Sequence, residues 1–155
     1  MVVTNIMGKN IPSFDLVFEN IKYISDKFFI ITSNIQINIF SKCSQIFFDA
    51  IYKSCPKSMY QFFNIAGYFE DTDGLIPLMF IPMSNKSQRL YTLILDEIVG
   101  ILRSFNIDIT KITNKYMYDF EIGLRNSIKE IFPNSILDGC FFHYTKLLWK
   151  HAKIL

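Results

Sequence analysis

At 155 residues the chain has the length of one domain, and half of its residues are hydrophobic, with sixteen phenylalanines among them. This composition excludes general disorder, because such a chain buries enough apolar surface to offset its conformational entropy. The formal net charge of +2 gives no overall electrostatic argument for nucleic acid binding, so any basic surface must be a local patch.

The three cysteines and the lengths of the apolar runs indicate the cellular compartment of the protein. Cys43, Cys55 and Cys140 are an odd number without framework spacing, and no charged-then-apolar leader opens the sequence. A reducing intracellular compartment, nuclear or cytoplasmic, is therefore expected. The apolar runs are far shorter than the ~20 residues of a membrane helix, so no membrane span is predicted.

The N-terminal part of the chain carries few periodic signals. Residues 1–27 are expected to form a leading segment, and residues 28–155 the folded core. Residues 28–31 are a candidate strand, and a short helix is predicted from a capping Asn34 to Cys43. The buried side of this helix is expected to carry Ile35, Ile39 and Phe40.

Three apolar runs follow, each bounded by polar residues. The first, residues 46–52, reads as a buried strand with Asp49 in its middle. Residues 59–69 and 75–82 are further strand candidates, and the acidic, glycine-containing segment 70–74 between them is a turn. Two long apolar runs around such a turn form a hairpin, so the three strands are predicted to form an antiparallel meander.

The second half of the chain alternates between helices and strands. Apolar residues at three- and four-residue steps predict a long amphipathic helix over residues 87–105. The segments after it are read as a connector (107–113), a strand (115–118), a helix (120–131), a strand (136–137) and a helix (141–154). The packing residues expected on the middle helix are Ile122, Leu124, Ile128 and Ile131. The order predicts the α/β class with one mixed sheet, and the ribonuclease-H-like architecture has this order, as do other α/β folds.

Two acids stand out as candidate site residues. Asp49 lies within an apolar strand, where an ionised carboxylate is costly unless it is hydrogen-bonded or binds a cation, although a strand end or edge would also accommodate it. Asp119 follows a strand at its carboxyl end, the usual place for site residues, although it is also a plausible N-cap. Neighbouring strands would bring both acids together, as in metal-assisted phosphodiester chemistry, which usually adds a third acid. Glu121 is expected to point down the next helix, and neither Glu130 nor Asp138 lies in a suitable element.

The C-terminal segment offers a second pair of ligand types. Cys140 and His143 have a spacing that occurs in zinc sites, but a structural site needs four ligands, and His151 is the one further candidate nearby. The alternative is a buried cysteine beside a hydrogen-bonded histidine. Lysines on the last predicted helix form a basic face that would suit DNA or a protein partner. These lysines are Lys146, Lys150 and Lys153. The sequence also leaves open whether the chain forms homo-oligomers.

Several ordered blocks resemble the transposase domain of Mutator-like elements (MULE), a DDE-type family with a ribonuclease-H-like catalytic core. The family's first acid block resembles residues 49–53, with Pro56 and residues 60–62 after it. A second block, before the long helix, is similar to residues 82–86, with Tyr91 following. The third block matches position by position, over residues 119–121, 132–133 and 139–143. The resemblance extends from about Phe28 to the C-terminus.

The resemblance implies DNA strand cleavage and transfer with Mg²⁺ or Mn²⁺. Asp49 and Asp119 would be the first two metal-binding acids, and Cys140 and His143 the family's Cys-x-x-His element. With Lys53, the lysines Lys146 and Lys150 would be candidate DNA contacts.

The sequence also departs from the family pattern. Ala50-Ile51 replaces Gly-Thr, Tyr52 replaces Phe, and Lys146 replaces a Gln. The third acid, a Glu expected beyond the Cys-x-x-His element, has no counterpart, and no zinc-type DNA-binding module precedes the core. The expectation is therefore an incomplete or decayed transposase core, inactive alone. The alternatives are a domesticated or degenerate binding module and an α/β domain without a site.

Overall fold

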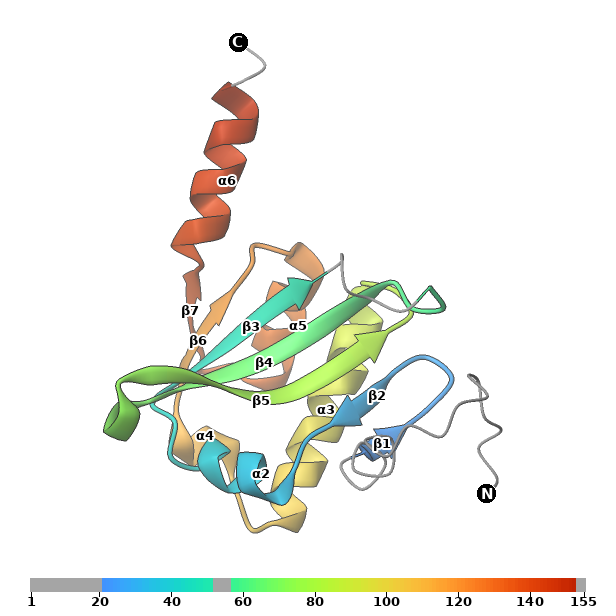
Figure 1. The fold of residues 1–155 in the computed structure, drawn as a ribbon, viewed down its shortest axis with the longest axis vertical. Helices are drawn as coiled ribbons and strands as arrows, with labels where there is room; N and C mark the ends of the chain where they lie inside the picture. Colours follow the sequence, from blue (N-terminus) through green and yellow to red (C-terminus); the bar gives the residue numbers. More distant parts are fainter. Residues whose placement is uncertain (1–20, 52–56, 153–155) are drawn as a thin grey trace, which may run out of the picture.

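A computed structural model describes residues 21–51 and 57–152. Its centre is a seven-stranded mixed sheet in the order β1-β2-β5-β4-β3-β6-β7 (Figure 1). The strands are β1 (Ile21–Ile24), β2 (Phe29–Ile31), β3 (Gln45–Ile51), β4 (Gln61–Phe69), β5 (Gly74–Met83), β6 (Lys115–Tyr118) and β7 (Ile136–Gly139). The helices are α2 (Asn34–Phe40), α3 (Gln88–Ser104), α4 (Ile109–Ile112), α5 (Ile122–Ile131) and α6 (Phe141–Ala152). The predicted α/β class is confirmed.

The antiparallel meander is confirmed in strands β3, β4 and β5. Residues of β3 pair with β4 from Gln45↔Tyr68 to Ile51↔Phe62, and β4 pairs with β5 along its whole length. A short 3-10 turn, Glu70–Thr72, joins β4 to β5, and Asp73 follows it in the left-handed region at φ 48°. Asp tolerates this conformation better than most residues, which explains an acidic turn at this place.

Only one face of β3 is buried. Exposure alternates along β3, so Ile46 and Phe48 face the core while Phe47 and Asp49 lie on the other, partly exposed face. The prediction of a fully buried strand around Asp49 was therefore wrong. Asp49 avoids the cost of full burial because the period of two in a strand places it opposite the core residues.

The core lies between the sheet and the helices α3 and α5, which cover the same face (Figure 1). Helix α3 begins after Ser87, whose hydroxyl accepts a hydrogen bond from the backbone N–H of Leu90. The predicted apolar stripe is largely confirmed. Its buried members include Leu90, Ile94, Ile98 and Leu102, whereas Leu93 is exposed.

The alternation of the second half is confirmed with shifted boundaries. Strands β6 and β7 run parallel to each other, and β6 runs parallel to β3. The predicted connector contains the one-turn helix α4, which Asp108 caps through the backbone N–H of Thr110. Helix α5 begins two residues later than predicted. Ile122 is consequently 76% exposed instead of packed, while Leu124 and Ile128 are buried as expected.

The N-terminal elements depart further from prediction. Strand β1 lies inside the segment expected to lead into the core, and it pairs with β2 at the edge of the sheet. Ser33, not Asn34, caps α2, in a capping box with Gln36. This start turns the helix so that Ile35 is 72% exposed and Ile37 is buried, so the buried side was predicted incorrectly at Ile35. The helix also ends at Phe40 and not at Cys43.

Within the described residues, no helix is long and apolar enough to cross a membrane.

Candidate functional site

The two acids singled out in the sequence lie at the same end of neighbouring strands. Strands β3 and β6 pair in parallel with Ile46 opposite Tyr116 and Phe47 opposite Met117. Continuing this register by two residues places Asp49 level with Asp119, which follows the last residue of β6. The negative charge of Asp49 contributes to raising the pKa of Asp119. The structure thus brings together two carboxylates that are far apart in the sequence.

Asp119 does not cap the helix that follows. Glu121 occupies the N-cap position of α5, and its backbone N–H donates to Asp119 Oδ1 at 3.4 Å. Burial raises the pKa of Asp119 to about 6, with the negative charge of Glu121 as the next cause, while the Glu121 N–H and His143 oppose the shift. The protein therefore holds this carboxylate where ionisation is costly unless a positive charge is near.

His143 supplies a third functional group beside the acids. It lies in the first turn of α6, and its Nε2 is 3.5 Å from Asp49 Oδ1. The side chain of Asp49 is 49% exposed, yet its Oδ1 is buried and accepts no hydrogen bond. His143 thus places a ring nitrogen next to the buried oxygen of Asp49.

Asn64 adds an acceptor that no sequence pattern indicated. It is the residue of β4 directly opposite Asp49, and the two side chains lie on the same face of the sheet. Its Oδ1 is also buried without a hydrogen-bond partner. Two buried acceptors on paired residues are costly unless water or a cation satisfies them. The antiparallel register is the signal that would have identified Asn64.

The side-chain oxygens of Asp49, Asp119 and Asn64 are of the chemical type that binds a hard divalent cation. Mg²⁺ and Mn²⁺ prefer carboxylate and carbonyl oxygens, and Asp49, Asp119 and Asn64 provide both types. In the part of the chain that the structure describes, however, no group of three or more His, Cys, Asp or Glu residues could hold a metal ion. The chemistry of the donors fits such an ion, but the set of acidic ligands is small.

Cys140 continues the sheet pairing through its backbone, whereas His143 contacts Asp49 through its side chain. The thiol of Cys140 is free, and its backbone N–H donates to the Tyr118 carbonyl at 2.9 Å, which continues the β6–β7 pairing. Since His143 lies against Asp49, the Cys-x-x-His spacing joins a strand end to the acid site. The side chain of His151, the further zinc candidate, lies outside the described residues.

A strained residue separates Asp119 from Glu121. Phe120 has φ 66°, in the left-handed region that bulky residues rarely adopt. Its ring occupies the space above Gly139, where a Cβ would lie 2.1 Å from the ring. The ring also neighbours Tyr118 and Tyr144, with centroid separations of 5.7 Å and 6.2 Å. The glycine that precedes Cys140 is thus explained, because any side chain there would displace Phe120.

Glu121 does not point down α5 as predicted from the sequence. Its Oε2 accepts a hydrogen bond from the hydroxyl of Tyr91 at 2.7 Å, and its Oε1 lies 3.8 Å from Lys86 Nζ. The Tyr91 hydroxyl in turn accepts a hydrogen bond from Gln61 Nε2 at 2.6 Å. The sequence blocks around Gln61, Lys86 and Glu121 therefore meet in space.

Two of the candidate DNA-contacting lysines lie on the surface of the last helix. Lys146 and Lys150 are exposed on α6, which projects from the body of the molecule (Figure 1). The same helix exposes Phe141 and Trp149, at 75% and 70%. The candidates Lys53 and Lys153 lie outside the described residues.

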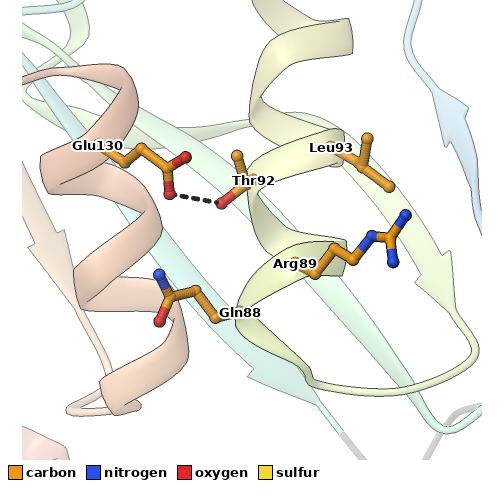
Figure 2. A pocket seen from close by; sticks show the side chains of 5 residues that line it. All are labelled: Gln88, Arg89, Thr92, Leu93 and Glu130. Atoms are coloured by element: carbon orange, nitrogen blue, oxygen red, sulfur yellow. Dashed lines mark hydrogen bonds between the residues drawn. The ribbon is translucent and has the colours of Figure 1, made fainter.

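A shallow depression between α3 and α5 contains none of the predicted site residues (Figure 2). Its volume is about 370 Å³, and Thr92 donates a hydrogen bond across it to Glu130 at 3.2 Å. The lining residues are Gln88, Arg89, Thr92, Leu93 and Glu130. This depression is therefore no part of the acid site.

Comparison with known families agrees with the sequence blocks. Residues 45–147 match the MULE transposase domain, from the first residue of β3 into α6. The match includes Asp49, Asp119, Cys140 and His143. No curated protein matches the chain. Because the matched region is more than half of the 155 residues, the chain belongs to the MULE transposase family.

Proposed function

We propose that this chain is part of a DNA transposase core in which Asp49 and Asp119 hold Mg²⁺ or Mn²⁺. The observation that carries the proposal is the placement of both carboxylates at one end of the parallel pair β3 and β6. The strand order β5-β4-β3-β6-β7, an antiparallel meander followed by two parallel strands, supports the ribonuclease-H-like assignment. Family membership supports DNA as the partner.

The chemistry divides between the ion and the protein. A divalent ion bound there would polarise a phosphodiester and make a bound water more acidic. Asp49 and Asp119 would provide carboxylate ligands, and the Asn64 Oδ1 would provide a neutral oxygen. His143, 3.5 Å from Asp49, would orient that carboxylate and balance its charge. We favour Mg²⁺ or Mn²⁺ over zinc at Cys140 and His143, because His143 Nε2 lies against a carboxylate oxygen of Asp49.

We further propose that the 155-residue chain cleaves little or no DNA by itself. Two-ion chemistry clamps both the attacking and the leaving oxygen, and it usually uses more than two carboxylates. Among residues 21–51 and 57–152, no group of three or more acids, histidines or cysteines could hold a metal ion, and Glu121, the other acid close to Asp119, is held by Tyr91 and Lys86. A third acid would have to be contributed from elsewhere.

The experiment measures Mn²⁺ binding and DNA nicking with the same protein. Titration calorimetry is expected to detect Mn²⁺ binding that is lost in Asp49→Asn and Asp119→Asn but retained in Asp138→Asn, an exposed acid on β7. A plasmid-nicking assay is expected to show no cleavage. Absence of Mn²⁺ binding would overturn the metal site, whereas Mn²⁺-dependent nicking abolished by Asp119→Ala would overturn the inactivity.

A binding module without catalysis is the second candidate, and one observation favours it. Helix α6 projects from the body with Lys146 and Lys150 one turn apart on its surface. Two lysines on one helix face suit a phosphate backbone. Salt-dependent DNA binding that survives loss of both acids but weakens in Lys146→Ala/Lys150→Ala would support this function. Binding that needs the acids and divalent metal would exclude it.

A further inference from the structure

Three segments that are distant in the sequence converge on the hydroxyl of Tyr91. Gln61 on β4 and Tyr91 on α3 are both fully buried. Gln61 Nε2 donates to this hydroxyl at 2.6 Å, and the hydroxyl donates to Glu121 Oε2 at 2.7 Å. The hydroxyl is therefore both acceptor and donor in one chain of hydrogen bonds. This chain leads from the interior of the sheet to the segment that carries Asp119.

The Glu121 carboxylate is directed away from its ordinary local partners. It is the N-cap residue of α5, but its side chain makes no capping hydrogen bond. The stabilisation that a capping side chain gives to a helix is therefore absent here. Its two oxygens instead face Tyr91, in the first turn of α3, and Lys86, which precedes α3. The side chain thus tethers the 119–121 segment to α3.

The tethered segment is strained at its centre. The backbone N–H of Glu121 is the donor to Asp119 Oδ1, and Phe120 between them has φ 66°. A left-handed conformation at a non-glycine residue is unfavourable and persists only when its surroundings hold it. Here the Phe120 ring over Gly139 holds one side of the turn. The Glu121 tether holds the other.

We propose that Gln61, Tyr91 and Glu121 are positioning residues that hold the Asp119 carboxylate in the orientation required for cation binding. The proposal rests on the proposed function of Asp119 as a metal ligand. Tyr91 acts through Glu121 and does not contact the cation. Gln61 orients the Tyr91 hydroxyl, since its own Nε2 also lies 3.1 Å from Met83 Sδ and is held in place.

The experiment compares two buried tyrosines. Tyr116 is also buried, and its hydroxyl donates to the Thr113 carbonyl at 3.3 Å. Tyr91→Phe and Tyr116→Phe therefore each remove one buried hydroxyl, which makes two hydrogen bonds at Tyr91 and one at Tyr116. Both variants are expected to lose stability in urea unfolding, and Tyr91→Phe is expected to lose more. Only Tyr91→Phe is expected to weaken Mn²⁺ binding in calorimetry, by about tenfold or more, the usual effect of losing a partner behind a metal ligand. Equal Mn²⁺ affinities of the two variants would overturn the proposal.

A second pair of variants separates the tether from charge. Glu121→Ala and Glu121→Gln remove the same negative charge, but only glutamine keeps an oxygen that accepts from Tyr91. We expect the glutamine variant to bind Mn²⁺ more tightly than the alanine variant, about threefold or more, as partial rescue of the lost hydrogen bond. This pair remains informative if Tyr91→Phe does not fold. Equal affinities would indicate a purely electrostatic effect and would overturn the proposal.

Hydrogen exchange in metal-free protein distinguishes failure of the tether from failure of the proposed function. Tyr91→Phe is expected to accelerate exchange of the Glu121 amide by about tenfold, whereas Tyr116→Phe leaves it unchanged. Unchanged exchange in both variants would overturn the positioning role even if the wild type binds Mn²⁺. Accelerated exchange in a protein that binds no Mn²⁺ would overturn the metal site while supporting the tether.

Discussion

Replacing Asp119 by asparagine should stabilise the metal-free protein at neutral pH. Asparagine keeps the oxygen that accepts the Glu121 N–H but removes a charge that burial and the neighbouring Glu121 disfavour. Burial and this neighbour raise the pKa of Asp119 from 3.8 to about 6. Each pKa unit corresponds to about 1.4 kcal/mol, so the ionised carboxylate destabilises the fold by up to about 3 kcal/mol.

The sign of the pH dependence follows from the raised pKa. Between pH 3.8 and about 6 the folded protein holds a proton that the unfolded chain releases, so wild-type stability falls as the pH rises through this window. Above about pH 6 the full cost of ionisation is present. The advantage of Asp119→Asn should therefore be up to about 3 kcal/mol at pH 7.5 and only about 1 kcal/mol at pH 4.5.

Urea unfolding in a chelating buffer measures both values. The matched control is Asp138→Asn, which removes one charge at an exposed position and should change the free energy of unfolding by less than about 0.5 kcal/mol. A neutral or destabilising effect of Asp119→Asn at pH 7.5 would refute the reasoning. An advantage that does not change with pH would also refute it.

Three further perturbations test other parts of the site and fold. At pH 7.5, saturating Mn²⁺ should make the wild type more stable to unfolding than Asp119→Asn, because a bound ion favours the ionised carboxylate. A wild-type urea midpoint that does not change with Mn²⁺ would contradict this. Gly139→Ala should lower the free energy of unfolding by about 1–3 kcal/mol, because its Cβ would meet the Phe120 ring, and should be nearly neutral in a Phe120→Ala background. Additive effects in this double-mutant cycle would argue against the contact. Ser33→Ala should cost about 1 kcal/mol through the lost capping box with Gln36, measured by thermal unfolding, whereas Asn34→Ala should cost less. A larger stability loss in Asn34→Ala than in Ser33→Ala would indicate that Asn34 is the cap.

Local patterns predicted most of the elements because they depend on neighbours in the sequence. The stripe of α3 and the three strands of the meander were predicted with small boundary errors. Errors arose where two adjacent residues competed for one role. Ser33 and Asn34 are both good caps, and the choice between them rotates α2 and exposes Ile35.

The same distinction applies to the acid site. Asp49 and Asp119 could be proposed from the sequence, because each residue type stands out in its local context and the blocks around them match one family. Asn64 and Tyr91 could not be proposed as parts of this site. Their places depend on the register between strands and on the packing of α3 against α5, which no local pattern contains.

The sequence by itself determined the class of fold and the family and indicated the two candidate acids, because these follow from periodicity and from residue types in a fixed order. Only the tertiary structure decided which groups surround Asp119. The left-handed turn at Phe120, the tether from Tyr91 to Glu121 and the approach of His143 to Asp49 join segments that are far apart in the chain. Desolvation and charge at one carboxylate are properties of that assembled environment, and they give Asp119 its raised pKa.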